Sequence, residues 1–296
     1  MKTKEILTQF NALRCASEAD MNLFKQQLKH GANEPFFADG LSEYVGISSF
    51  HRVSQHYVLA TIEQKGTWLI SKTTLKKLSS CNRHKNHDAL SIDYQKKSRF
   101  SYVIIHKDMV SIIPLLSKID ELCHTQDQVL IALDGFSASG KTTIGHLLSC
   151  IYDANIAHTD DFFKKIETDP RDPLSIHGAN IDFQKINDTI IKPFTQKEGY
   201  SYQPFDFKSH QHQSKVTVSY KPVLIMEGAY SMHPKLDANY DFQVFVEVPR
   251  LKANYRILKR NGLKRLWGFM NKWIPKEIAY VKALEIKEKA NFILKR

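Results

Sequence analysis

The stretch GFSASGKTT, residues 135–143, decides the fold of this chain. It fits the pattern G-x-x-x-x-G-K-[ST] at every fixed position. The preceding QVLIALD (128–134) has the apolar character of a buried strand, and KTTIGHLLSCIY (141–152) has helical apolar spacing. A strand, a glycine-rich loop and a helix in this order are the context of a phosphate-binding loop. The stretch therefore predicts a P-loop domain rather than a Gly/Ser-rich turn that fits by chance.

The residue types inside the loop suit a nucleoside triphosphate. Gly135 and Gly140 allow backbone conformations that a Cβ would forbid, so several N–H groups can point at one anion. Lys141 is expected to reach the β- and γ-phosphates of ATP, and Thr142 to place its hydroxyl on Mg²⁺. The helix that begins near Lys141 adds its positive N-terminal end. The predicted nucleotide-binding residues are Gly135, Ser137, Ser139, Gly140, Lys141, Thr142 and Thr143.

Three further apolar runs predict strands after the loop. They are NIAHTDD (155–161), KPVLIMEG (221–228) and YDFQVFVEV (240–248), and helical segments alternate with them. Such alternation indicates a largely parallel, doubly wound sheet. Ligands of these sheets bind at the carboxyl ends of the strands. The loop, the Asp160–Asp161 pair and Glu227 are all expected at that edge.

The acidic residues at these strand ends suit phosphoryl transfer to an alcohol. Such a reaction needs one carboxylate to accept the proton of the attacking hydroxyl and others to help hold Mg²⁺. Asp160 and Asp161 could divide these tasks, and Glu227 follows four apolar residues as a metal-facing carboxylate would. The structural alternative for the aspartates is a capped turn. The neighbouring phosphate loop favours the catalytic interpretation.

The C-terminal segment is strongly basic. The net charge of the chain is +11, and residues 250–296 hold 14 Lys and Arg against 3 Glu. Arg256 and Arg260 are four residues apart and share one face of a predicted helix. Arginines on a mobile helix could stabilise the charge of a transferring phosphoryl group, and a solvated basic helix is the alternative.

These motifs, in this order, resemble the uridine kinase-like branch of the P-loop kinases, in the phosphoribulokinase/uridine kinase superfamily. The resemblance rests on GFSASGKTT, DDFF, EGAYSMHP and YDFQVFVEVPRLKANYRILKRNG, with GANIDFQKINDTIIKPF, SYQPFDF and WIPKEIAY beside them. It covers residues 108–296. It implies a P-loop NTPase-type parallel sheet flanked by helices with a helical lid. It also implies phosphorylation of a nucleoside such as uridine, or a similar small alcohol, with Mg-ATP.

The resemblance assigns roles to individual positions. Asp160 matches the catalytic base, Arg256 and Arg260 match lid arginines, and Lys141 and Thr142 match the nucleotide-binding pair. Phe163 stands where nucleoside-phosphorylating members often have Tyr. The implied site comprises the catalytic Asp160, Lys141, Arg256 and Arg260, the metal-binding Thr142, Glu227 and Asp161, and the substrate-binding Asp182, Asp206 and Phe163.

Residues 1–107 are expected to form a separate α+β region of unknown role before a P-loop kinase domain, 108–296. Helical patterns occupy residues 4–15 and 18–29, β-runs lie in 57–72, and another strand lies in 98–107. Cys81, His84 and His87 fall within seven residues, but a polar loop explains them better than a zinc site that lacks a fourth ligand.

The overall composition indicates the class of protein and its expected location in the cell. The 296 residues are 42% hydrophobic and 25% charged, as in a soluble globular protein. No segment approaches the roughly 20 apolar residues of a membrane helix, so we expect no membrane partner. Four scattered cysteines argue against a disulfide framework and for a cytoplasmic location.

Several alternatives stay open at this point. The acceptor could be pantothenate or a sugar, or the chain could be a nucleotide-binding regulatory protein with a kinase-like sensor core. A nucleic-acid partner is not expected, because a lid accounts for the basic tail and no aromatic stacking motif accompanies it. The N-K-x-D motif of a GTP switch is absent. Homo-oligomer formation is left open.

Overall fold

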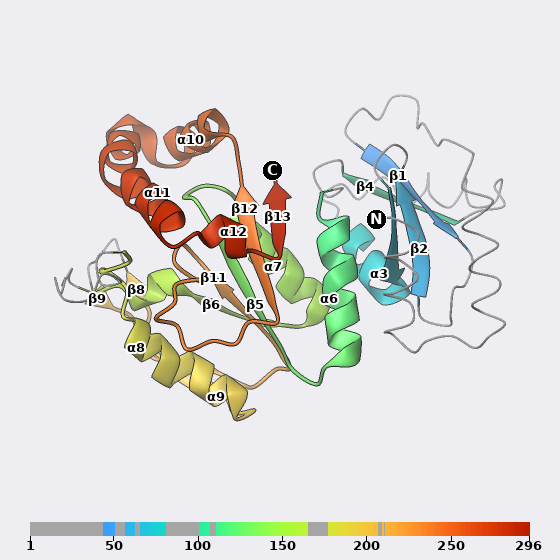
Figure 1. Ribbon diagram of the computed structural model, residues 1–296, viewed down its shortest axis with the longest axis horizontal. Helices are drawn as coiled ribbons and strands as arrows, with labels where there is room; N and C mark the ends of the chain where they lie inside the picture. Colours follow the sequence, from blue (N-terminus) through green and yellow to red (C-terminus); the bar gives the residue numbers. More distant parts are fainter. Residues whose placement is uncertain are drawn as a thin grey trace. The chain divides into compact units, whose positions relative to one another are not determined.

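The computed structural model divides into two compact units, Met1–Asp127 and Gln128–Arg296, each with a sheet of its own (Figure 1). The helices expected in residues 4–15 and 18–29, and the group of Cys81, His84 and His87, lie outside the residues that it describes. The described residues are 44–50, 57–62, 66–80, 101–106, 111–164, 177–206, 209 and 211–296.

The first unit contains a four-stranded antiparallel sheet in the order β3-β2-β1-β4. Its strands are β1 (Tyr44–Phe50), β2 (Tyr57–Ile62), β3 (Gly66–Ser71) and β4 (Ser101–His106). The predictions of β2, β3 and β4 are confirmed. The sequence did not predict β1, because a glycine and two serines interrupt its apolar residues.

A buried carboxylate links the two described helices of this unit. The helices are α3 (Lys72–Ser80) and α6 (Ile113–Thr125). Asp120 of α6 accepts hydrogen bonds from the Thr74 hydroxyl (2.5 Å) and from the Ser71 backbone N–H (2.7 Å). Because Asp120 is only 4% exposed, these two donors satisfy a charge that would otherwise be costly to bury.

The second unit is built on a five-stranded sheet in the order β13-β12-β5-β11-β6, and every neighbouring pair is parallel. The strands are β5 (Val129–Gly135), β6 (Asn155–His158), β11 (Val223–Glu227), β12 (Phe242–Glu247) and β13 (Phe292–Lys295). The predicted P-loop NTPase-type parallel sheet is therefore confirmed. Its order reverses at β5, and ligands of open parallel sheets bind at such a point.

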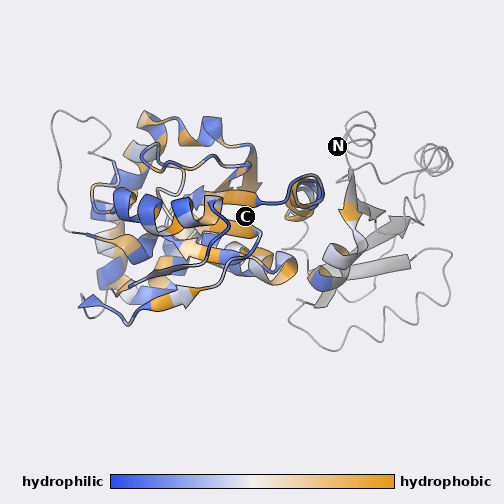
Figure 2. Cartoon of the chain, turned by 90° about the horizontal axis from the view of Figure 1, so that it is seen from below, coloured by the Kyte–Doolittle hydropathy of each residue, from blue (hydrophilic) through white to orange (hydrophobic). Residues whose placement is uncertain are grey.

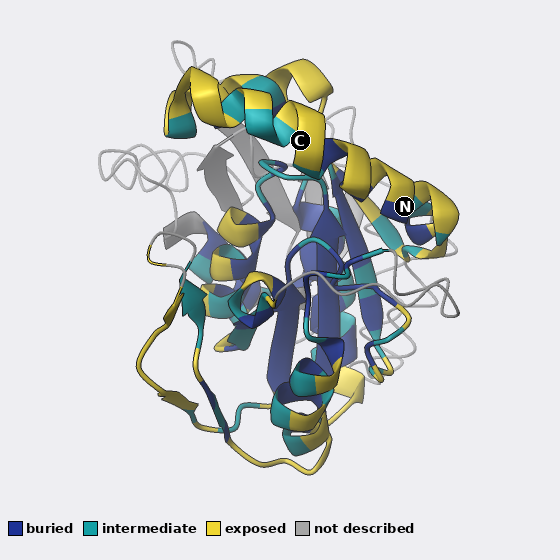
Figure 3. Ribbon diagram, turned by 90° about the vertical axis from the view of Figure 1, so that its left-hand side faces the viewer, coloured by how far each residue is buried: buried dark blue, intermediate teal, exposed yellow. Residues whose placement is uncertain are grey.

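The central strands form because their sequences are almost continuously apolar. Every residue of β5 and β11 is buried, which is the pattern of parallel strands covered on both faces. Hydrophobic residues gather on the sheet of this unit in Figure 2, and the same strands are dark blue in Figure 3. A rigid, buried sheet of this kind fixes the strand ends that carry the polar residues.

Helices and short strands surround this sheet. Helix α7 (Lys141–Tyr152) packs on β5, β6 and β11, and α12 (Ile286–Lys289) packs on β12. The remaining segments before β11 are η2 (Thr159–Phe162), α8 (Phe183–Ile186), η4 (Asn187–Ile191), α9 (Lys192–Thr195), β7 (Tyr200–Tyr202), β8 (Phe205–Asp206), β9 (Gln211–His212) and β10 (Val216–Val218).

Three consecutive helical segments leave the sheet after β12, and we call them the lid helices. They are α10 (Arg250–Gly268), η5 (Phe269–Trp273) and α11 (Ile274–Ala283). They lie at the end of the sheet toward which β12 points (Figure 1), and much of their surface is exposed (Figure 3). Gly262 breaks α10 with φ 80° and ψ 172°. In the described part of the chain, no helix has both the length and the apolar character to cross a membrane.

Candidate active site

The phosphate loop joins β5 to α7 in a conformation that needs its glycines. Gly135 has φ 145°, and a Cβ there would lie 2.3 Å from the carbonyl oxygen of Val246 on β12. Gly140 has φ 100° at the N-cap of α7. Ala138 also lies in the left-handed region, with φ 60°. The loop therefore presses against the sheet at its start and turns sharply into the helix at its end.

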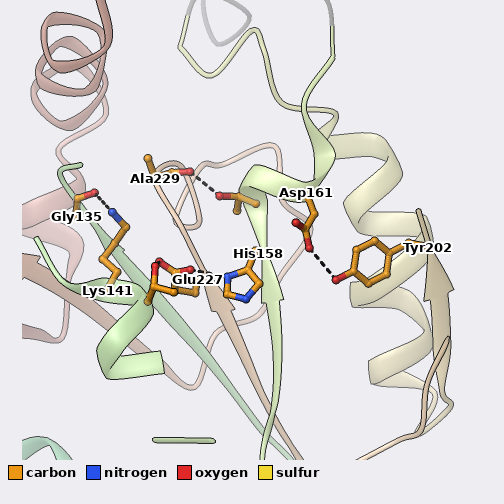
Figure 4. A network of polar contacts seen from close by, with 9 residues as sticks. Gly135, Lys141, His158, Asp161, Tyr202, Glu227 and Ala229 are labelled. Carbon is orange, nitrogen blue, oxygen red and sulfur yellow. Dashed lines mark hydrogen bonds and ion pairs between the residues drawn. The ribbon is translucent and has the colours of Figure 1, made fainter. Parts of the chain in front are cut away.

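The ammonium group of Lys141 lies over the start of this loop. Its Nζ donates hydrogen bonds to the carbonyl oxygens of Gly135 (2.8 Å) and Phe136 (3.1 Å), as Figure 4 shows for Gly135. The side chain is largely buried, with 7% exposed. A buried cation ringed by main-chain groups is suited to a phosphate, which would supply the opposite charge.

A chain of hydrogen bonds links α7, β11 and β6. The Thr142 hydroxyl donates to Glu227 Oε1 (3.1 Å), and Nδ1 of His158 shares a hydrogen bond of 2.6 Å with Glu227 Oε2 (Figure 4). Burial favours a higher pKa for Glu227, but the bond from His158 and the charge of Lys141 outweigh it, so the pKa is lowered. The bond to Glu227 raises the pKa of His158, and burial opposes this rise.

The donor set at Glu227 fits a Mg²⁺ ion shared with phosphate. A hydroxyl oxygen and a carboxylate oxygen meet here beside the phosphate loop, and hard oxygen ligands of this kind suit Mg²⁺. Asp161 faces away, because its Oδ2 accepts a hydrogen bond of 2.8 Å from the Tyr202 hydroxyl (Figure 4). The described residues hold no group of three or more His, Cys, Asp or Glu arranged for a metal. Phosphate oxygens and water would therefore complete the coordination.

Asp160 lies in the single turn η2, which directly follows the carboxyl end of β6. The residue is in contact with solvent, but many protein atoms also surround its carboxylate. Their desolvation of the charged form raises the pKa of Asp160 to about 6. Lys141 opposes the rise, whereas Glu227 and Glu277 add to it. The pKa of Asp161 is raised too, mainly by burial. A carboxylate with a pKa near neutrality is well placed to accept a proton.

A close crossing of two loops holds Asp160 near Glu227. The Thr159 hydroxyl donates a hydrogen bond of 2.9 Å to the carbonyl oxygen of Ala229 (Figure 4). Gly228 has φ 141°, and a Cβ there would lie 1.9 Å from Thr159 Oγ1. Only glycine therefore fits between Glu227 and the turn that carries Asp160.

The two predicted lid arginines lie differently. Arg256 of α10 donates hydrogen bonds of 3.0 Å to the carbonyl oxygens of Ala138 and Ser139 in the phosphate loop. Arg260 is exposed, and its Nε donates to the neighbouring Asn261 Oδ1 at 2.7 Å. The structure thus brings Arg256 to the loop and leaves Arg260 at the surface of the lid helices.

The predicted acceptor-side residues are engaged locally. Asp182 is the N-cap of α8 and accepts a hydrogen bond of 3.1 Å from the Lys185 backbone N–H. Asp206 accepts one of 2.9 Å from the Ser209 hydroxyl. The Phe163 ring lies 6.4 Å from that of Phe205 and 6.1 Å from that of Trp273, measured between centroids. Phe163 therefore belongs to an aromatic group that includes the last residue before α11.

The remaining predicted loop residues differ in exposure. Ser139 is fully buried, and its hydroxyl has no hydrogen-bond partner among the described residues. Thr142 and Thr143 are exposed at the first turn of α7. Ser137 contacts the lid helices through a residue that the sequence did not single out.

That residue is Glu277 of α11, which binds the phosphate loop directly. Its Oε2 accepts a hydrogen bond of 2.9 Å from the Ser137 backbone N–H, and its Oε1 accepts one from the Ser137 hydroxyl. Three residues further on, the Tyr280 hydroxyl donates to Asp134 Oδ2 at 2.8 Å. One feature of the sequence could have identified Glu277: it is the single acidic residue between Arg250 and Leu284.

The parallel sheet and the phosphate loop between β5 and α7 together show that this chain has a P-loop NTPase fold. No protein-family profile matches it. Its structure is similar to that of a possible uridine kinase from Bacillus stearothermophilus, with 20% identity, 61% of this chain and 99% of that chain covered, and a TM-score of 0.46. It is also similar to a candidate fructose transport system kinase from a Silicibacter species, with 20% identity, 56% and 89% covered, and a TM-score of 0.38. At this level of similarity, function depends on the residues of the site itself.

Proposed function

We propose that this chain is an ATP-dependent phosphotransferase that phosphorylates a hydroxyl of a small molecule, with a nucleoside such as uridine as the leading acceptor. One observation carries the proposal. The phosphate loop with Lys141, the Thr142–Glu227 pair and Asp160 all lie at the carboxyl edge of one parallel sheet. Phosphoryl transfer needs these three functions next to one another: phosphate binding, metal binding and a base.

In the proposed reaction the acceptor hydroxyl oxygen attacks the γ-phosphorus of ATP. Asp160 accepts the hydroxyl proton, the bond between the γ-phosphorus and the β,γ-bridging oxygen breaks, and ADP leaves. Lys141 and Arg256 stabilise negative charge on the transferring group, Lys141 from inside the loop and Arg256 from the lid. Thr142 and Glu227 would hold Mg²⁺, which supplies neutralisation of the phosphate charge when bound.

The aromatic group beside Asp160 supports a planar acceptor. Phe163 follows the η2 turn directly, and Phe205 and Trp273 lie near its ring. Aromatic side chains stack well on nucleobases, whereas pantothenate and simple sugars have no aromatic ring for such stacking. A nucleoside is therefore the first acceptor to test.

Product analysis by mass spectrometry tests the proposal. Purified protein with Mg-ATP is incubated with uridine, cytidine, other nucleosides, pantothenate and simple sugars, each in turn. We expect a phosphorylated nucleoside that disappears in the Lys141→Ala variant. A phosphorylated sugar or pantothenate would keep the reaction class and replace the acceptor. ATP binding without any phosphorylated product would favour a nucleotide-binding regulatory protein instead.

A further inference from the structure

Glu277 places a negative charge where the chain is otherwise prepared to receive an anion. The residue is 5% exposed, and its carboxylate accepts hydrogen bonds from both donors of Ser137, the backbone N–H and the hydroxyl. Main-chain N–H groups in glycine-rich loops are the donors that phosphates use. A carboxylate on such a donor takes a position that a phosphate oxygen would compete for.

The contact lies at the end of the loop where the γ-phosphate is expected. Ser137 directly follows Gly135 and Phe136, whose carbonyl oxygens hold the ammonium group of Lys141. In a P-loop this lysine reaches the β- and γ-phosphates, while the start of the following helix serves the phosphates nearer the nucleoside. Glu277 also lies close enough to Asp160 for its charge to raise the pKa of that base. Glu277 is therefore near the reacting end of the triphosphate.

A purely structural brace would not need this charge. A glutamine side chain could accept the same hydrogen bond from the Ser137 backbone through its amide oxygen. The carboxylate adds repulsion toward an approaching phosphate, because like charges brought together in a partly buried site are costly. ADP lacks the γ-phosphate, so it would meet less of this repulsion than ATP.

We propose that Glu277 is a γ-phosphate sensor: its carboxylate holds the Ser137 donors, and the γ-phosphate of ATP displaces it, whereas ADP leaves it in place. This inference rests on the proposed function, because it takes the loop as an ATP site. It gives α11 a positioning role, since the same helix carries Tyr280, which stays bonded to Asp134 at the root of the loop. Displacement of Glu277 would therefore move the first turn of α11 away from the loop, while the Tyr280–Asp134 hydrogen bond holds the next turn in place.

Calorimetric titration of the intact chain with Mg-ATP and Mg-ADP tests the sensor. The variants are Glu277→Gln and, as a control that removes the same charge from an exposed site on α12, Glu288→Gln. We expect Glu277→Gln to lower the Kd for ATP about tenfold and to change the Kd for ADP less than about twofold, within the usual range of coupling between sites. Glu288→Gln should change neither Kd.

The ratio of the two Kd values separates a sensor from a brace. A brace would shift ATP and ADP together, so a parallel change, or weaker ATP binding by Glu277→Gln, overturns the sensor. The wild-type titration tests the proposed function separately. A wild-type chain that binds ATP while Glu277→Gln shifts both nucleotides equally refutes the sensor alone. A wild-type chain that binds neither nucleotide refutes both proposals.

Discussion

The hydroxyl of Tyr280 donates a hydrogen bond of 2.8 Å to Asp134 Oδ2, so the lid helices are joined to the residue that precedes the phosphate loop. Asp134 is 1% exposed and also accepts hydrogen bonds from the backbone N–H groups of Gly135 (2.6 Å) and Met232 (3.0 Å). Burial raises the pKa of Asp134 to about 6, and these three donors oppose the rise. The residue just before the phosphate loop is thus a buried carboxylate, and hydrogen bonds from three donors stabilise its ionised form.

Tyr280→Phe is expected to destabilise this unit. It removes one donor from a buried carboxylate, a loss of about 1–3 kcal/mol in the free energy of unfolding. Urea unfolding followed by circular dichroism measures it. Tyr255→Phe, on the exposed surface of α10, is the matched control and should leave stability unchanged. Equal midpoints for the two variants would contradict the role assigned to the Tyr280–Asp134 bond.

Asp160→Asn should lower kcat and leave the Kd for ATP nearly unchanged. An amide cannot accept the acceptor's proton, and general-base catalysis is worth about 10²–10⁴-fold. Steady-state kinetics with the acceptor identified by mass spectrometry gives kcat, and calorimetry gives the Kd. Asp188→Asn, at an exposed position in η4, is the control. Normal turnover by Asp160→Asn would show that another group takes the proton.

The activity should fall as the pH drops through about 6. Asp160 must be ionised to act as a base, and its raised pKa means that protonation begins nearer neutrality than for an ordinary aspartate. The proton-accepting form is therefore complete above this pH and is lost below it. A profile of kcat/KM between pH 5 and 8 should show this acidic limb. The limb should be missing from the residual activity of Asp160→Asn, and a limb shared by both proteins would assign it elsewhere.

Glu227→Gln should raise the Mg²⁺ concentration needed for half-maximal activity. The change removes the negative charge beside the Thr142 hydroxyl and alters the partner of His158. Substitutions around metal ligands cost about 10–100-fold in metal affinity, and we expect a shift of that size. Activity measured against Mg²⁺ concentration, after chelation and dialysis, gives the value. Glu247→Gln, at the end of β12, is the control, and an equal Mg²⁺ requirement in both variants would exclude Glu227 from the metal site.

Gly262→Ala should lower kcat through the lid helices. Gly262 has φ 80° and ψ 172°, a region that non-glycine residues avoid at a cost of about 1–3 kcal/mol, and no atom within 4 Å would obstruct an added Cβ. The effect is therefore one of backbone conformation rather than of packing. Gly268→Ala provides the comparison, because Gly268 has helical φ −62° and equally open surroundings. Alanine there should keep full activity, so equal losses of kcat would refute a special role for the Gly262 kink.

The sequence predicted those parts of the site that depend on local patterns. Strands β5 and β11 could be predicted because uninterrupted apolar runs identify buried parallel strands. Since parallel strands end at one edge, the sequence also indicated that Asp160 and Glu227 would lie close to the phosphate loop. The bond of Glu277 to Ser137 could not be predicted in this way, because 140 residues separate the two and no periodicity relates them.

The directions in which individual side chains point could not be predicted from the sequence either. Asp160 and Asp161 are neighbours, but successive side chains in a tight 3₁₀ turn point about 120° apart, and Asp161 meets Tyr202 instead of Glu227. Arg256 and Arg260 share a helical spacing, yet only the Arg256 side chain is bonded to the loop. These differences arise from tertiary contacts that a one-dimensional pattern does not encode.

Strand β13 covers the edge of the sheet formed by β12, so shortening or tagging the chain at this strand would affect that edge. Its four residues pair with β12, and the Arg296 N–H bonds to the Glu247 carbonyl oxygen at 2.9 Å. After the lid helices the chain returns to the sheet through α12, which packs on β12, and then through this strand. Removal of residues 292–296 would therefore leave α12 in place but uncover the backbone edge of β12. An unpaired apolar edge of that kind recruits strands from other molecules, so a small truncation should appear first as aggregation.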